Sequence, residues 1–541
     1  MTAVQGSSRL PADLSSPNAA HRDVRWAIWL MILASAASLA ARIATVRATT
    51  GETPMLSAND RSRWCTVCSL VDEGTYAIDS LVQIRHPETK RRFWKSIDTV
   101  RHRGPDGREH YYSSKPPLFP TLLAGEYWAL RQLTGLTLAD HPFQVMRWML
   151  VITNLLPLLV YFGVLWRCVE RLAVTRAALL YVMAVATWGT FLTTFGVTIN
   201  NHLPAAIAVL LAAAGALRIW HGATSWWLFA GTGLAAAFAV ANELPALAFF
   251  ACITLLVLWR APCRTLTAYL PAAAVVAAGF FGTNYLAHGT WVPPYAHRSD
   301  GPVVAQVPVA AVSELDQERI PASVRDALAR AGMPLSDVAT VRVRTAGQRW
   351  SIWNREGAHR YAAVATADAV EIRHWGNWYD YEGSYWNTER QGVDRGEASP
   401  GVYAFHAVLG HHGVLSLSPV WLLSIWGVAA MVRGRPEGYR LFGWMVLAVT
   451  AVCLVFYISR PMLDRNYGGV SCGFRWMFWF IPLWLICLVP AADRLLHSRW
   501  GRILALLLLA ISVFSASYCA ANPWSHPWLW QWGEFAGWWP T

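Results

Sequence analysis

The chain has 541 residues, of which 55% are hydrophobic and 14% are charged, and its formal net charge at pH 7 is +12. Soluble domains contain about 45–50% apolar and about 25% charged residues, so this composition excludes a soluble enzyme, a secreted disulfide scaffold and a disordered chain. Long apolar runs also exclude an outer-membrane barrel, which is built from short alternating strands. We therefore expect an all-α polytopic membrane protein.

Eleven mostly apolar segments are predicted to cross the membrane, since each approaches the roughly 20 residues that span a hydrocarbon core of about 30 Å. They lie near residues 26–46, 145–166, 177–198, 202–219, 226–241, 243–259, 267–287, 413–432, 440–458, 472–492 and 502–520. With the N-terminus inside, every inner loop carries arginine or, as with Arg218, adjoins one at the end of a span, as the positive-inside rule requires. The basic excess thus predicts a lipid bilayer, and no nucleic acid, as partner.

The first apolar run is also typical of a secretory signal, but it exceeds the usual core of about 7–15 residues, which favours an uncleaved span. The segment 116–133 is apolar yet carries Glu126 and Arg131, so we expect it to lie at the outer interface or to re-enter the membrane there. The predicted parts are a cytoplasmic tail at 1–25, a membrane part at 26–287 with an outer loop at 47–115, an outer subdomain at 288–412, a second membrane part at 413–520 and an outer tail at 521–541.

The first outer loop contains a predicted helix that begins at Ser57 or Asn59, either of which can cap it. Its apolar stripe is formed by Trp64, Val67, Cys68 and Val71. Asp60 heads this stripe, so its carboxylate points toward the membrane or the bundle. A carboxylate held there is either neutralised or used as a base; the alternative is a cap residue paired with Arg61 or Arg63.

The same loop ends in Tyr-Tyr-Ser-Ser-Lys-Pro-Pro-Leu at residues 111–118. Pro116 and Pro117 fix the backbone and begin the next helix, so Lys115 is held immediately before the first turn of that helix. A fixed ammonium at the membrane surface suits a lipid phosphate, and the alternative is a snorkelling interfacial lysine.

Asp60 in this first loop, followed by the Lys-Pro-Pro-Leu motif before a second interfacial helix, resembles the GT-C class of multispanning glycosyltransferases. The lipid A aminoarabinose transferases and, more distantly, the protein O-mannosyltransferases are similar in this pattern and in topology. The specific resemblance covers about residues 55–120.

The resemblance implies a polyprenyl-phosphate sugar donor, an inverting displacement with Asp60 as general base, and Lys115 as a ligand of the donor phosphate. It also implies a multi-pass protein of the inner (plasma) membrane with its active site on the extracytoplasmic side. The acceptor class stays open between lipid, glycan and protein. An Asp-x-Asp motif typical of metal-dependent oligosaccharyltransferases is not seen, so we expect no divalent metal and no cofactor.

Arg475 lies near the outer end of the tenth predicted span, where a charge is expensive unless it is functional or paired. We expect it to bind the donor phosphate; the alternative is an ion pair with Asp464 or Glu243. Candidate sugar ligands lie where predicted spans connect at their outer ends: Asn201 and His202 between the third and fourth spans, and Glu243 between the fifth and sixth. Loop polarity alone would also place them there.

The outer subdomain is predicted to be mixed α/β, with a helix over 321–331 and a hairpin that pairs 341–344 with 350–353. Trp378 and Tyr381 lie in an aromatic cluster beside carboxylates and could stack on a sugar, but aromatic belts at membrane interfaces use the same residues. Cys65 and Cys68 lack a second pair, and three histidines at 406, 411 and 412 suit an interface better than a metal.

The rival interpretation is a transporter or flippase of a lipid-linked saccharide, because charged groups at span ends also line substrate paths. An inverted repeat would favour that interpretation, and we find none in the sequence. A polymerase or ligase with a diphosphate-linked donor is a third interpretation, which differs in the lipid that is released.

Overall fold

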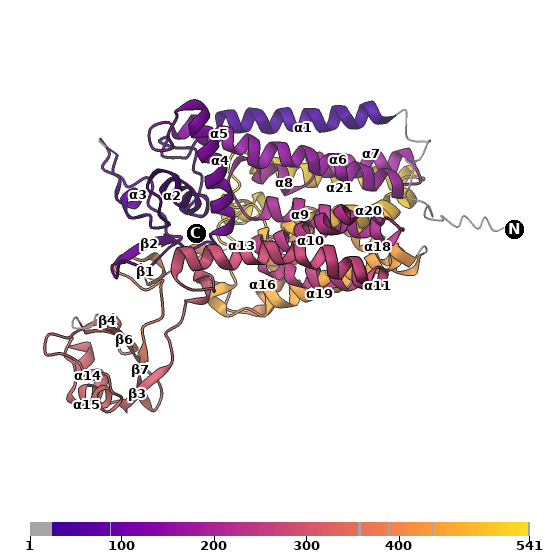
Figure 1. The fold of residues 1–541 in the computed structure, drawn as a ribbon. Coiled ribbons are helices and arrows are strands. Elements are labelled where there is room, and N and C mark those ends of the chain that lie inside the picture. The colour runs from indigo at the N-terminus through magenta and orange to yellow at the C-terminus, as the bar shows by residue number, and fades with distance from the viewer. Residues whose placement is uncertain (1–23, 87, 355–358, 388–389, 435–436, 539–541) are drawn as a thin grey trace.

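The computed structural model describes residues 24–86, 88–354, 359–387, 390–434 and 437–538. Figure 1 shows long helices side by side in one bundle, with short helices and the β1–β2 hairpin at one end and a separate sheet beyond them. We call the end that carries α2 and α4 the capped end of the bundle and the other the open end.

Within the described residues, eight helical segments are long and apolar enough to cross a membrane. They are α1 (Arg25–Thr45), α5 and α6 (Pro142–Leu150 and Leu156–Leu172, joined by a π-helical turn), α7 and α8 (Arg176–Trp188 and Phe191–Thr194), α9 (His202–Trp220), α12 and α13 (Pro262–Arg264 and Leu270–His288), α19 (Glu437–Ile458), the 3₁₀ helix Arg475–Phe480 with α20 (Ile481–Leu495), and α21 (Arg499–Tyr518). Each coincides with a predicted span.

The other three predicted spans coincide with shorter apolar helices. These are α10 (Trp226–Asn242), a segment that contains α11 (Leu247–Arg260), and α18 (Trp421–Arg433). The eighth predicted span, 413–432, is interrupted because α17 (Val414–Leu417) ends before Pro419 and α18 then begins anew. Eight of the eleven spans thus meet the length requirement, and the other three stay predictions.

The centre of the bundle is formed by α7, α9 and α20, whose side chains are mostly buried, whereas α1, α13 and α21 lie at its periphery. Backbones approach closely where α18 packs on α20: a Cβ at Gly427 would stand 1.7 Å from the carbonyl oxygen of Cys487. Glycine is therefore required there, because any side chain would push the two helices apart.

The capped end begins with α2 (Ala58–Asp72) and α3 (Asp79–Gln83), followed by the antiparallel hairpin of β1 (Thr99–Arg103) and β2 (Glu109–Ser113). Next comes α4 (Leu118–Thr134), which starts directly after Pro117 as expected and packs against α2. Figure 1 shows α2, α3 and α4 gathered at this end of the bundle. Within the described chain, α4 is not among the helices that qualify as spans.

A five-stranded antiparallel sheet has the order β3-β7-β6-β5-β4. Its elements are β3 (Val303–Pro308), α14 (Ala311–Asp316), α15 (Ala322–Arg330), β4 (Thr340–Thr345), β5 (Arg349–Asn354), β6 (His359–Ala365) and β7 (Ala369–His374). Both predictions for this region are confirmed: α15 occupies the predicted helix, and β4 pairs with β5 across a turn in which Gly347 has a φ of +68°. The sheet and its helices bury their own hydrophobic core.

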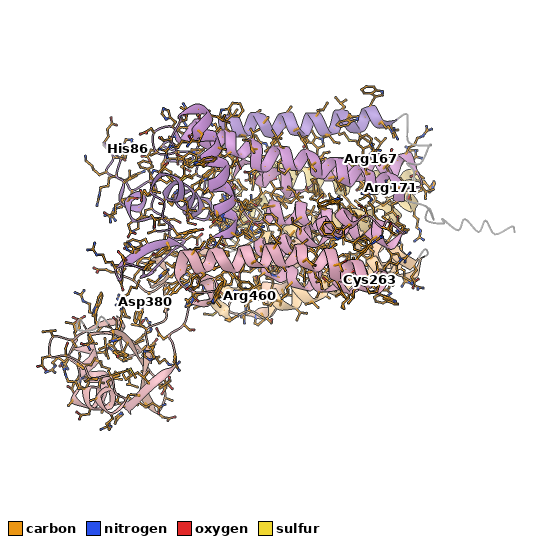
Figure 2. The ribbon with its side chains drawn as sticks, in the orientation of Figure 1. His86, Arg167, Arg171, Cys263, Asp380 and Arg460 are labelled. Atoms are coloured by element: carbon orange, nitrogen blue, oxygen red, sulfur yellow. The ribbon has the colours of Figure 1, made fainter. Side chains whose placement is uncertain are left out.

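The chain returns to the bundle through α16 (Pro400–Val408), and α22 (Trp528–Phe535) follows the last long helix. Figure 2 shows Arg167, Arg171 and Cys263 at the open end and His86, Asp380 and Arg460 at the capped end. The two arginines, which belong to a predicted inner loop, therefore lie at the end opposite the sheets.

Candidate functional site

A cavity of about 400 Å³ lies at the capped end, where α2 and the start of α4 meet the ends of α9, α10 and α19. Five of the sequence candidates line it, and the structure therefore brings these distant residues together: Lys115, Asn201, His202, Glu243 and Arg475. Three further cations and one further carboxylate line it as well: Arg63, Arg298, Arg460 and Asp464. Five cations thus face the cavity against two carboxylates.

Arg63, on α2, is 3% exposed and is held by neutral oxygen atoms. Its guanidinium donates to the backbone carbonyl of Asn59 at 2.9 Å, to the Asn59 side chain, and to Oδ1 of Asn201 at 2.8 Å. Burial lowers the pKa of Arg63 to about 10, against the attraction of Asp98, so the group stays protonated at neutral pH. From the sequence alone, Arg63 is expected only as a partner of Asp60.

Arg475 begins the 3₁₀ helix that precedes α20. Its Nε donates to the carbonyl oxygen of Gly468 at 2.6 Å, and one terminal nitrogen donates to Nε2 of His202 at 2.8 Å. Neither ion pair of the expected alternative occurs among the described residues, because Asp464 pairs with Arg298 and Arg460, and Glu243 hydrogen-bonds to His202. Arg475 is thus oriented without a carboxylate partner.

Glu243 lies where α10 ends and is 6% exposed. His202 Nδ1 hydrogen-bonds to Oε1 of Glu243, and Asn201 donates to the same oxygen at 2.6 Å. The carboxylate, the imidazole and the guanidinium of Arg475 therefore form one hydrogen-bonded row along the cavity wall. Asn201 joins this row to Arg63.

Lys115 forms an ion pair with Asp98, with Nζ and Oδ2 separated by 3.0 Å. The β1–β2 register explains the pair: Thr99 opposes Ser113, and the Ser114 amide donates to the Asp98 carbonyl, so residues 98 and 115 emerge together. Burial lowers the pKa of Lys115 to about 8, although Asp98 opposes this shift. Burial alone would raise the pKa of Asp98. The attraction of Lys115, Arg475 and Arg63 outweighs burial, so the pKa of Asp98 is lowered.

Asp60 is 1% exposed and is not among the residues that line the cavity. It completes a capping box with Ser57, and its oxygens accept hydrogen bonds from the backbone amides of Leu56 and Ser57 and from the hydroxyls of Ser57 and Thr198. Burial raises the pKa of this carboxyl, while those hydrogen bonds oppose the shift. In the described part of the chain it pairs with neither Arg61 nor Arg63. Its predicted role as a base stays a prediction.

Trp378 and Tyr381 also lie outside the lining of the cavity. Trp378 stacks between His102 and His297, with ring centroids 4.0 and 3.6 Å away, and the Tyr381 hydroxyl contacts the Thr99 hydroxyl at 2.6 Å. These contacts join the loop after β7 to the β1–β2 hairpin. A contact of either side chain with substrate stays a prediction.

Trp524 is a site residue that the sequence interpretation did not single out. Arg475 lies over its ring at 4.8 Å from the centroid, and its indole N–H donates to Thr198 at 3.3 Å. It belongs to the predicted outer tail, some fifty residues after Arg475, so spacing alone could not have placed it there. It does not line the cavity, but it packs against the guanidinium of a residue that does.

No family model and no curated protein matches the chain. Among solved structures, the apo Archaeoglobus fulgidus oligosaccharyltransferase is 12% identical with a TM-score of 0.41, over 96% of this chain and 58% of that one. The complex of that enzyme with Zn and sulfate gives 11% and 0.40, over 94% and 55%. The A. fulgidus oligosaccharyltransferase AglB with an inhibitory peptide and a dolichol-phosphate gives 12% and 0.38, over 93% and 56%.

The chain thus spans a little over half the length of these structures. With TM-scores below 0.5, the likeness assigns no function to this chain.

Proposed function

We propose that the protein is an integral membrane glycosyltransferase that moves a sugar from a polyprenyl-phosphate donor to an acceptor hydroxyl on the extracytoplasmic side, with inversion. The observation that carries the proposal is the pair Arg63 and Arg475. Both guanidinium groups face one cavity and, within the described residues, both are held by neutral partners. A buried charge without a counterion is costly, so this cavity favours an anionic ligand.

A phosphate fits these cations because a guanidinium presents a planar fork of donors that matches two phosphate oxygens. Lys115 adds a third cation at the start of α4, and its flexible stem lets the ammonium move from Asp98 toward a bound phosphate. The geometry supports the phosphate-binding roles expected of Lys115 and Arg475 and adds Arg63 to them.

The remaining lining supports a lipid-linked phosphate. Phe119, Val240, Leu244 and Phe456 contribute apolar side chains to the same cavity. Leu244 is 52% and Phe456 46% exposed, so apolar surface borders the cavity where helices face the bilayer. An amphiphilic anion, with its phosphate on the arginines and its chain among these residues, satisfies both halves of the lining.

The reaction requires an acceptor oxygen to bond to the anomeric carbon while the bond from that carbon to the phosphate oxygen breaks. The proton of the acceptor hydroxyl passes to a carboxylate, and the bonding electrons leave with the lipid phosphate, whose new charge is stabilised by the fixed cations. In this proposal Glu243 takes the proton, because it lines the cavity beside His202 and Asn201.

Asp60 is the base that the resemblance implies, but its carboxylate accepts four hydrogen bonds behind the cavity wall. We assign it the positioning of α2, and hence of Arg63, one turn further along the helix. Substitutions of Glu243 and Asp60 are then expected to differ in effect. Removing the base stops the chemical step, whereas removing the capping-box partner loosens the start of α2.

The test is release of free polyprenyl phosphate from polyprenyl-phosphate sugars by the purified protein in native lipid extract. Intact protein and Arg61→Gln should release it, whereas Arg63→Gln should not. Arg61 is the matched control, since it lies on the same helix and donates to the Lys95 carbonyl away from the cavity. If the folded intact protein releases no lipid although acceptors are present, transfer is refuted and flipping of the lipid-linked sugar in proteoliposomes becomes the assay.

A further inference from the structure

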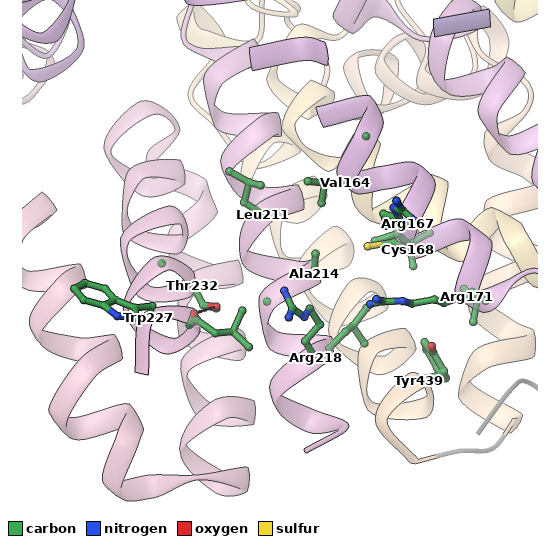
Figure 3. A pocket seen from close by; sticks show the side chains of 17 residues that line it. Val164, Arg167, Cys168, Arg171, Leu211, Ala214, Arg218, Trp227, Thr232 and Tyr439 are labelled. Carbon is green, nitrogen blue, oxygen red and sulfur yellow. Dashed lines mark hydrogen bonds between the residues drawn. The ribbon is translucent and has the colours of Figure 1, made fainter. Parts of the chain in front are cut away.

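A second cavity, of about 450 Å³, lies at the open end between α6, α9 and α10 (Figure 3). Figure 3 shows Arg167, Arg171 and Arg218 around one part of it and Trp227 and Thr232 at its other side. Nothing in the proposed transfer uses this cavity, which is at the end of the bundle opposite Arg460.

Three arginines meet here with little compensating charge. Glu170 pairs with Arg25 at 3.2 Å and with Arg167 at 3.5 Å, so one carboxylate is shared between two cations. Arg171 and Arg218 form no ion pair within the described residues, and the buried Nε of Arg171 has no hydrogen-bond partner there. The excess of unpaired donors favours an anion at this rim.

The floor of the cavity is apolar and open. On α9 it is formed by Leu211, Ala214 and Gly215, which lie on the same face as Arg218. A Cβ added at Gly163 on α6 or at Gly231 on α10 would meet no atom within 4 Å, so the walls leave a trough. Leu211 is 38% exposed although α9 is otherwise largely buried, so the trough opens where the helices face the bilayer.

We propose that this trough is a binding site for an anionic phospholipid, with the headgroup phosphate on Arg171 and Arg218 and one acyl chain along α9. Charge complementarity selects the occupant: a cationic rim above an apolar trough within membrane helices matches a phosphate attached to a hydrocarbon chain. A water-soluble phosphate would use the arginines and leave the trough empty. The bound lipid joins α6 to α10 across α9.

The experiment is native mass spectrometry of the purified full-length protein with dioleoyl phosphatidylglycerol and, separately, dioleoyl phosphatidylcholine. Intact protein should bind the first phosphatidylglycerol more tightly than phosphatidylcholine. Arg171→Gln and Arg218→Gln should each weaken phosphatidylglycerol binding about fivefold, and about 25-fold together. The control Arg264→Gln removes an exposed arginine of α12 that does not line the cavity and should change nothing.

Gly163→Leu and Gly231→Leu fill the trough and keep every arginine, so they test the acyl chain separately. Both should weaken phosphatidylglycerol binding at least as much as one arginine substitution. Unchanged binding in the double arginine variant would overturn the site. Loss of binding in the arginine variants alone, with competition by millimolar inorganic phosphate, would overturn the lipid assignment in favour of a soluble anion. If the arginine variants fail to fold, the glycine variants still decide, because leucine is a better helix former than glycine.

Discussion

The two ends of the bundle both gather arginines, but they hold them differently. At the capped end, Arg63 and Arg475 are fixed by oxygen and nitrogen acceptors from several chain segments, and a tryptophan lies over one of them. At the open end, Arg171 and Arg218 come from two adjacent helices and lack ion-pair partners in the described chain. Fixed donors suit a reaction in which charge develops at one atom, whereas loosely held donors suit adhesion to a lipid headgroup.

The largest expected effect comes from the carboxylates of the capped end. Glu243→Gln should lower turnover by about 10²–10⁴-fold, the usual contribution of a general base, with little change in donor binding. Single-turnover rates and donor affinity measured on the same preparation check this. His202→Ala should lower turnover less, because it removes a positioning partner and leaves the carboxylate.

Asp60→Asn tests whether Asp60, which does not line the cavity, has a role different from that of Glu243. It should destabilise the protein by about 1–3 kcal/mol, since buried donors of the cap lose a carboxylate partner. Thermal denaturation in detergent and turnover at low temperature measure the two effects. A fully stable Asp60→Asn variant without turnover would return the role of base to Asp60.

The next effect is the loss of one fixed cation. Arg475→Gln should reduce kcat/KM about 100-fold, because it removes charged hydrogen bonds to the leaving phosphate and releases His202. The same substitution at Arg171 should leave kcat/KM within about twofold, because that arginine lies outside the reaction. Equal losses of kcat/KM in Arg475→Gln and Arg171→Gln would contradict the different roles assigned to the two ends of the bundle.

A smaller effect is expected from pH. The pKa of Lys115 is lowered to about 8 by burial, so the ammonium is present below that pH and is lost as pH rises through it. The donor KM should rise about fivefold between pH 7 and pH 9.5, while Arg63, with a pKa of about 10, keeps most of its charge. The proposed donor is a phosphodiester, which does not titrate in this range. Lys115→Arg should flatten the profile, and an unchanged slope in that variant would assign the titration to another group.

The smallest effect is expected at the aromatic contact with the hairpin. Trp378→Ala removes one ring and its two stacking contacts, with His102 on the hairpin and with His297, worth about 0.5–1.5 kcal/mol each, so the loop after β7 should detach more readily. Limited proteolysis of 288–412 should speed up, while turnover changes less than about threefold. A collapse of turnover with unchanged proteolysis would instead support the contact with sugar that the sequence suggested.

The sequence predicts the long helices, the hairpin at 341–353 and five of the cavity residues, because hydropathy, turn residues and charges at span ends are local features. It does not reveal Asp98, whose position beside Lys115 depends on the register of β1 and β2. Nor does it distinguish Arg63 from Arg61, since only the docking of α2 decides which arginine faces the cavity. Asp60 is a further example. Its spacing predicts its place on the helix, but not whether its side chain lines the cavity.

The position of Trp524 has a consequence for biosynthesis. The residues that line the cavity run from Asn59 to Trp476 in the sequence. Trp524 lies outside this lining, but its ring packs on Arg475 and its indole N–H donates to Thr198, whose hydroxyl also donates to Asp60. A nascent chain therefore lacks this support for Arg475 until α21 has been inserted and the segment beyond it has folded back. At about 5–20 residues per second, roughly 20 to 90 seconds separate synthesis of Asn59 from that of Trp524. Throughout this interval the residues that line the cavity lack the ring that packs on Arg475, so the cavity reaches its final form only near the end of synthesis.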